Sequence, residues 1–172
     1  MITDVLLDHA ALVPLALALV VLTCAVVGVL ALRARRSRPV LWTLVALAAL
    51  PVVALTLVPS TKGRGDGVGC AVQFSLPSLG SVELLANVAL LVPVVLFAAL
   101  ATRRPLLALA AGTGASVLVE AVQALTPALG RACDTNDWSM NTVGAVLGAA
   151  LAWLLLRGVT ARRGGLPVVT GR

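Results

Sequence analysis

Five apolar stretches, each long enough to cross a lipid bilayer, constrain this chain more than any other feature of its sequence. A membrane-spanning helix needs about 20 predominantly apolar residues. The stretches cover residues 11–32, 40–58, 82–101, 105–125 and 138–156. They leave too little charge for a water-soluble surface, because 12% of the residues are charged, against about 25% in soluble domains. The sequence therefore predicts an all-α membrane protein, a single domain over residues 1–172 with five transmembrane helices.

The basic residues indicate how these helices are oriented. On one side of the predicted bundle lie Arg33, Arg35, Arg36, Arg38, Arg103, Arg104, Arg157, Arg162, Arg163 and Arg172. On the other side lie Lys62, Arg64 and Arg131. Because cytoplasmic segments carry the excess of Lys and Arg, we expect an external N-terminus and a cytoplasmic tail over residues 157–172. The basic residues behind the net charge of +6 then mark the cytoplasmic ends of the helices, and we expect no nucleic-acid partner. Ala, Val and Leu dominate the composition and Arg outnumbers Lys, which is typical of a bacterium with GC-rich DNA, and the expected location is the bacterial plasma membrane.

Two of the three cysteines fall in the long loops on the predicted outer side. Cys70 lies in the loop before residue 82, and Cys133 lies in the loop before residue 138. Disulfides persist in an oxidising compartment, so these residues are candidates for a bridge that ties the two loops together. The alternative is a pair of free thiols that never meet. Cys24 lies within the first span and is expected to pack as a small apolar residue.

Three of the predicted spans carry a carboxylate and an amide that are three or four residues apart. The pairs are Glu83 with Asn87, Glu120 with Gln123, and Asp137 with Asn141. Such spacings place both members on one face of a helix. Each pair lies near the predicted outer end of its span. Because polar groups inside a bilayer are costly and usually face the bundle interior, we expect the three pairs to converge there.

Further residues extend this candidate site. Arg131 is the nearest cation in the sequence and is expected to pair with Glu120, Asp134 or Asp137. Small residues share the polar stripes of the last two spans. The stripes are Gly112, Ser116, Glu120 and Gln123, and then Asp137, Asn141, Gly144 and Gly148. Since small residues allow close helix approach, these two stripes are predicted to pack on each other.

A purely structural interpretation remains open for every member of the candidate site. Amides within membrane helices often serve only as interhelical hydrogen bonds, each contributing about 0.6 kcal/mol. Glu83 and Asp137 also lie where a helix begins, and carboxylates are favoured at helix N-termini. Glu120 is far from such a position, so helix capping does not explain it.

The sequence offers little catalytic or metal-binding chemistry. The single histidine is His9, so the sequence predicts neither a zinc site nor a histidine-based hydrolase, and we expect neither a metal nor a cofactor. No P-loop or nucleophile elbow occurs. The carboxylates could carry out acid–base chemistry or hold a hard cation, but neither use has a sequence signature. Whether the chain is an enzyme stays open.

Residues in the second half of the chain resemble the signature of VanZ-like membrane proteins. The run contains Glu120, Gln123, Gly130, Arg131, Cys133, Asp134, Asp137, Asn141, Gly144 and Gly148, preceded by the segment from Glu83 to Asn87 and Pro93. The resemblance covers roughly residues 50–156. It implies low-level resistance to teicoplanin, a lipoglycopeptide that binds peptidoglycan precursors. By analogy it marks Glu83, Asn87, Glu120, Gln123, Arg131, Asp134, Asp137 and Asn141 as candidate ligand-binding residues.

The leading functional hypothesis is therefore a VanZ-like protein of the cell envelope. Its polar cluster would bind or modify a lipid or cell-wall precursor headgroup at the outer leaflet, with the bilayer, a lipid-linked precursor or a lipoglycopeptide as partner. The alternative is a structural or regulatory membrane subunit whose polar residues only hold helices together. The oligomeric state is left open by the sequence.

Overall fold

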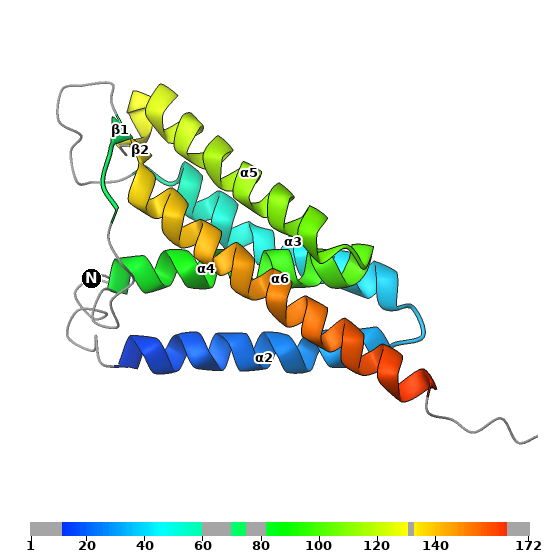
Figure 1. Ribbon diagram of the computed structural model, residues 1–172. Coiled ribbons are helices and arrows are strands. Elements are labelled where there is room, and N and C mark those ends of the chain that lie inside the picture. The colour runs from blue at the N-terminus through cyan, green and yellow to red at the C-terminus, as the bar shows by residue number, and fades with distance from the viewer. Residues whose placement is uncertain (1–11, 60–69, 75–81, 131–132, 165–172) are drawn as a thin grey trace, which may run out of the picture.

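The computed structural model describes residues 12–59, 70–74, 82–130 and 133–164, and five long helices dominate this part of the chain (Figure 1). The helices are α2 (Val13–Arg33), α3 (Ser37–Leu57), α4 (Val82–Thr102), α5 (Pro105–Leu125) and α6 (Thr135–Gly164). Each is long and apolar enough to span a membrane. The predicted all-α architecture with five membrane-spanning helices is thus confirmed. The protein is a membrane protein.

The observed helix boundaries agree with the predicted spans for four helices and differ for the fifth. Helix α6 begins at Thr135 and continues to Gly164, whereas the apolar pattern placed that span at 138–156. The pattern missed the first turn because it is polar. Asp134 precedes this turn, and its Oδ1 accepts a hydrogen bond from the backbone N–H of Asn136 at 2.8 Å. Asp134 is therefore an N-cap, a position at which Asp is strongly favoured.

Short connections set the antiparallel order of the helices. Residues 34–36 join α2 to α3, and Arg103 with Arg104 joins α4 to α5. Arg103 has a φ of 57°, the left-handed conformation that reverses the chain tightly. Thr102 Oγ1 accepts a hydrogen bond from the backbone N–H of Arg104 at 3.3 Å and stabilises the turn. Both connections therefore lie at the same end of the bundle, to which the C-terminal part of α6 also returns (Figure 1).

Helix α4 lies at the centre of the bundle. Its side chains include several that are almost completely buried, among them Val92, Val95, Leu96 and Leu100. Helices α2 and α3 instead expose most of their large apolar side chains. Apolar surface of this extent is unfavourable in water, and a bilayer removes the penalty. The bundle thus has a conventional packed core around α4 and a lipid-facing exterior formed largely by α2 and α3.

Close packing of α6 against α4 depends on glycines. A Cβ atom added at Gly144 would overlap the backbone carbonyl oxygen of Val88, and one at Gly148 would lie 2.6 Å from the carbonyl oxygen of Val92. The prediction that this stripe packs on α5 is therefore wrong for its glycines, which face α4. Asn141 does contact α5. At 3.6 residues per turn, Asn141 and Gly144 differ by about 60° around the helix, so the stripe is shared between two neighbours.

A small sheet closes the end of the bundle opposite the two short connections. Strands β1 (Cys70–Ala71) and β2 (Cys133–Asp134) pair in parallel, with Cys70 opposite Cys133 and Ala71 opposite Asp134. A disulfide joins Cys70 to Cys133. A single turn of 3₁₀ helix, η2 (Pro127–Leu129), lies between α5 and β2. Two loops that are far apart in the sequence are therefore tied together directly before α6.

The disulfide can be tested by counting reactive thiols. Under denaturing, non-reducing conditions, a maleimide-linked polymer is expected to modify one thiol, that of Cys24, which is free in the structure. After reduction, all three cysteines of the chain should react. Gel mobility of the full-length protein gives the count, with the maleimide-linked polymer itself added as the first thiol reagent when the membranes are dissolved in denaturant. Modification at three sites before reduction would mean that the bridge does not form.

Candidate functional site

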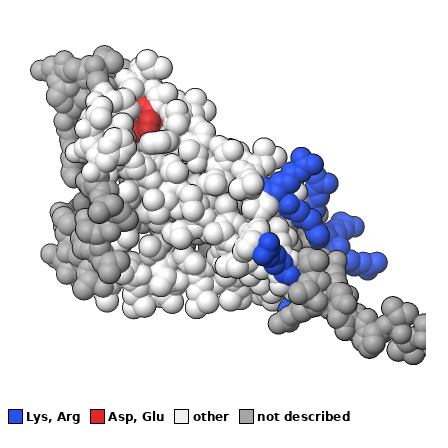
Figure 2. Space-filling view, viewed as in Figure 1, with Lys and Arg blue, Asp and Glu red and all other residues white. Residues whose placement is uncertain are grey.

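The described charges are separated along the bundle axis. Arginines gather at the end with the short connections, and acidic side chains lie toward the opposite end (Figure 2). The acidic residues that the structure describes are Glu83, Glu120, Asp134 and Asp137. They lie at the start of α4, in the last two turns of α5, in strand β2 and at the start of α6, respectively. The candidate site is thus at the end that carries the disulfide.

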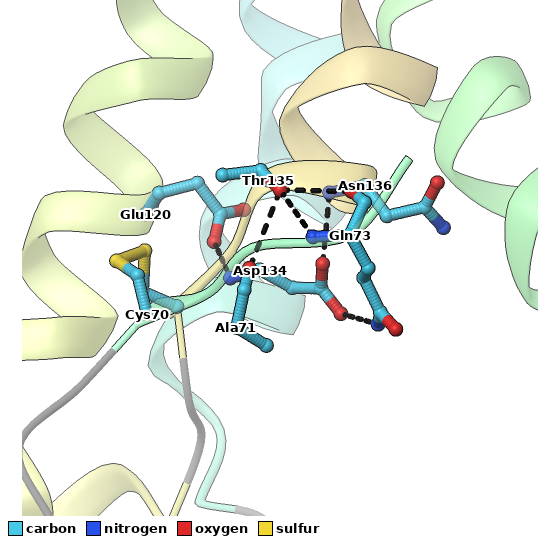
Figure 3. Close-up of a disulfide and its surroundings, with 8 residues drawn as sticks. Cys70, Ala71, Gln73, Glu120, Asp134, Thr135 and Asn136 are labelled. Carbon is cyan, nitrogen blue, oxygen red and sulfur yellow. Dashed lines mark hydrogen bonds between the residues drawn. A yellow bond between two sulfur atoms is a disulfide. The ribbon is translucent and has the colours of Figure 1, made fainter. Parts of the chain in front are cut away.

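Glu120 is the most deeply placed carboxyl group of this end. Its residue is 7% exposed, and its Oε2 accepts a hydrogen bond from the backbone N–H of Asp134 at 2.9 Å (Figure 3). Burial of a carboxyl group is costly unless hydrogen bonds compensate it. The compensating donor is supplied by strand β2, directly next to Cys133. The disulfide-linked sheet therefore positions the group that holds Glu120.

A second set of contacts fixes the segment 70–74, which we call the strap, on the start of α6 (Figure 3). Gln73 Nε2 donates to Asp134 Oδ2 at 2.5 Å, and the backbone N–H of Gln73 donates to Thr135 Oγ1 at 2.9 Å. The Thr135 hydroxyl in turn donates to the carbonyl oxygen of Gln73 at 2.8 Å. The carbonyl oxygen of Ala71 lies 3.3 Å from the same hydroxyl. Sequence reasoning missed Gln73 and Thr135, since neither lies in an apolar span or a spaced pair.

Two hydrogen bonds between helices lie next to this sheet. Asn87 Nδ2 on α4 donates to Asp137 Oδ1 on α6 at 2.6 Å. Asn141, one turn further along α6, donates from Nδ2 to Ser116 Oγ on α5 at 3.0 Å. Asn141 Oδ1 is buried without a protein partner. Ser116 was noted only as a small residue of a stripe, although its spacing of four from Glu120 carried the signal for this contact.

The structure brings most, but not all, of the predicted site residues together. Glu120, Asp134, Asp137, Asn87 and Asn141 form, with Ser116, the polar cluster described above. Gln123 is buried on α5. Arg131 lies outside the described residues, so its predicted pairing stays a prediction.

Glu83 departs from the predicted convergence. It is exposed at the start of α4 and takes part in none of the hydrogen bonds between described residues. A spacing of four residues leaves it about 40° from Asn87 around the helix. Its position agrees with the alternative interpretation, a carboxylate favoured by the helix N-terminus.

The chemistry available to the cluster is that of carboxyl, amide and hydroxyl groups. Within the part of the chain that the structure describes, no three His, Cys, Asp or Glu side chains are grouped so as to hold a metal ion. Carboxyl oxygens accept hydrogen bonds, and amides and hydroxyls both donate and accept. Such a set can hydrogen-bond a polar headgroup or exchange a proton with it.

The Asn87–Asp137 contact gives a stability prediction. We expect Asn87→Ala and Asp137→Ala to be coupled in a double-mutant cycle by about 0.6 kcal/mol, the average for interhelical hydrogen bonds in membrane proteins. The measurement is unfolding of the purified protein in mixed detergent micelles, with all four members of the cycle under identical conditions. Strictly additive effects of the two substitutions would show that the side chains do not interact.

Comparison with known proteins gives one match. The sequence model of the family described as VanZ/LLP1 matches residues 19–156, which is more than half of the chain. The matched region contains the polar cluster, the disulfide and helices α3, α4 and α5 in full. No curated protein and no solved structure matches the chain.

Proposed function

Because the chain belongs to the VanZ/LLP1 family, we propose that it protects a bacterial cell envelope against lipoglycopeptides such as teicoplanin. In this proposal the polar cluster binds or modifies the headgroup of a lipid or of a lipid-linked cell-wall precursor at the outer leaflet. The bacterial plasma membrane is the proposed location. Residues Gln123 and Arg131 are proposed to contribute to the same site.

The observation that carries this proposal is the way in which the carboxyl group of Glu120 is held. A carboxyl group that only joined two helices would need one side-chain partner on a neighbouring helix. Glu120 is instead held by the backbone of a strand, and that strand is fixed by a disulfide and by the strap. Polar groups within membrane proteins that face the interior usually mark function. An anchored carboxyl group close to the bundle end is suited to a ligand that arrives from the headgroup layer.

The structural alternative has its own supporting observation. Asn87 with Asp137 and Asn141 with Ser116 each pair across a helix interface, as expected of residues that hold helices together. These pairs can do so in a protein whose function lies elsewhere, in a complex with another membrane protein. The alternative predicts that Glu120 tolerates replacement by an amide.

The proposed orientation places the N-terminus and the disulfide-linked loops outside and the C-terminus in the cytoplasm. It rests on the arginines that gather at the opposite end of the bundle, because cytoplasmic segments carry the excess of positive charge. A fluorescent protein that matures only in the cytoplasm, fused after Arg172, is expected to fluoresce. An alkaline phosphatase fusion at the same point should be inactive, and the reverse pair of results would overturn the orientation.

The proposed activity is tested by the susceptibility of a teicoplanin-sensitive bacterial host. Cells that produce the full chain are expected to tolerate at least a doubling of the inhibitory teicoplanin concentration, relative to cells with an empty vector. Membrane abundance of the protein is measured in the same cultures. Unchanged susceptibility at confirmed abundance would contradict the proposed activity and leave the fold unaffected.

A further inference from the structure

The aromatic residues of this chain are few enough to be placed individually. The sequence contains three Trp, two Phe and no Tyr, and all five lie in the described regions. Trp42 and Trp153 are 45% and 44% exposed. Trp42 lies near the start of α3, and Trp153 lies in the part of α6 near Arg157, whose guanidinium stacks 3.6 Å from the centre of the Trp153 ring. These two tryptophans therefore supply interfacial aromatic groups at the arginine-rich end.

The opposite end has a single exposed aromatic side chain, and it does not come from a helix. Phe97 is 5% exposed and belongs to the core, and Trp138, at the start of α6, is only partly exposed. Phe74 in the strap is 71% exposed, and Val72 beside it is 78% exposed. Among the five aromatic residues, Phe74 is thus the one available to contact a bilayer interface at this end.

The strap is fixed on the bundle by hydrogen bonds of its backbone and of the Gln73 side chain. Gln73 uses its backbone and its side chain to bond Thr135 and Asp134, and the Ala71 carbonyl lies against the same hydroxyl. Val72 and Phe74 make none of these contacts, and their side chains are exposed. The disulfide at Cys70 fixes the beginning of the segment.

The strap is also level with the ends of the lipid-facing helices. It bonds residues 134 and 135, immediately where α6 begins, and β2 packs against α5. At this end the apolar exterior of α5 continues to its last residue, Leu125, which is 78% exposed. The exposed apolar side chains of the strap therefore lie at the bundle end where α5 ends and α6 begins.

From this placement we propose that Val72 and Phe74 form an interfacial membrane anchor, whose partner is the acyl-chain boundary of the adjacent lipid leaflet. Apolar side chains such as Phe and Leu insert at this depth in other interfacial segments. Insertion would hold the strap, and with it β2 and the Asp134 N–H that contacts Glu120, at the headgroup level. The inference goes beyond the proposed function and holds whichever side of the membrane this end faces.

A tryptophan placed in the strap tests the proposal. In a background with Trp42→Phe and Trp153→Phe, the variant Phe74→Trp is reconstituted into phosphatidylcholine vesicles. The fluorescence of the new residue is the difference from the same background without Phe74→Trp, in which Trp138 remains. We expect phospholipids brominated near the headgroup end of the acyl chains to quench this difference at least about twofold more than deeply brominated lipids, as for an interfacial residue. Aqueous acrylamide should quench it weakly.

The opposite pattern, strong quenching by acrylamide and none by brominated lipid, would overturn the anchor. Val72→Trp in the same background serves as a second probe and is expected to give the same result. Each variant is first checked for the thiol count of the folded protein, which shows whether the disulfide has formed. If Phe74→Trp fails that check, Val72→Trp decides the question. Neither result depends on teicoplanin susceptibility, so failure of the anchor is distinguishable from failure of the proposed function.

Discussion

Replacing Gly144 by alanine is expected to destabilise the bundle more than the same replacement at Gly28, Gly112 or Gly148. The new Cβ would overlap the carbonyl oxygen of Val88 and would lie 3.0 Å from its carbonyl carbon. These are backbone atoms of the central helix, so no side-chain rotation can relieve the overlap and α4 and α6 must separate. Overpacking in a core costs about 1–3 kcal/mol, and occasionally more. We expect a loss of at least this size in the free energy of unfolding.

Gly114→Ala is the matched control, because a Cβ at Gly114 meets nothing within 4 Å. Alanine is favoured over glycine within a helix by about 0.5–1 kcal/mol, so this variant should be as stable as the wild type or more so. Unfolding by sodium dodecyl sulfate in mixed micelles compares the three proteins. Equal stability of Gly144→Ala and the wild type would mean that α4 and α6 do not approach as closely as the structure has them.

Replacing Glu120 by glutamine is expected to abolish protection while leaving the fold intact. The side chains have nearly the same shape, and the glutamine carbonyl oxygen can accept the Asp134 N–H as Glu120 Oε2 does. The variant therefore keeps the hydrogen bond to β2. It loses only what a carboxyl group provides, which is the capacity to carry a negative charge or to exchange a proton. If these properties serve the ligand, the inhibitory teicoplanin concentration should fall to that of the empty-vector host.

The sequence predicted the spans because backbone hydrogen bonding in lipid leaves few options. An apolar stretch of sufficient length must form a helix there, and all five stretches do so. The amide and carboxyl residues Asn87, Asp137 and Asn141 were singled out by a separate argument. Their helical spacing places polar side chains on one face, and polar groups in a bilayer usually face the bundle interior. The start of α6 was not found from hydropathy, although Asp134 provided an N-cap signal.

Apart from the pairing of Cys70 with Cys133, long-range contacts that involve few residues could not be predicted. Strand β1 has two residues, too short for any periodicity, so nothing in the sequence indicated that Gln73 bonds to Asp134. Which helix packs against Gly144 could also not be predicted, because a stripe of small residues allows any neighbouring helix to approach closely. The structure resolves this through Val88, whose backbone fills the space that a side chain at Gly144 would occupy.

Whether the Glu120 carboxyl group acts in protection is tested by the teicoplanin susceptibility of a sensitive host that carries Glu120→Gln, at a membrane abundance matched to that of the wild type. Gly114→Ala serves as the control for substitution within α5. We expect the wild type and Gly114→Ala to protect the host and Glu120→Gln to leave it sensitive. Full protection by Glu120→Gln would contradict the proposed site, because the carboxyl group of Glu120 would then have no part in the function and the structural interpretation of the polar cluster would stand.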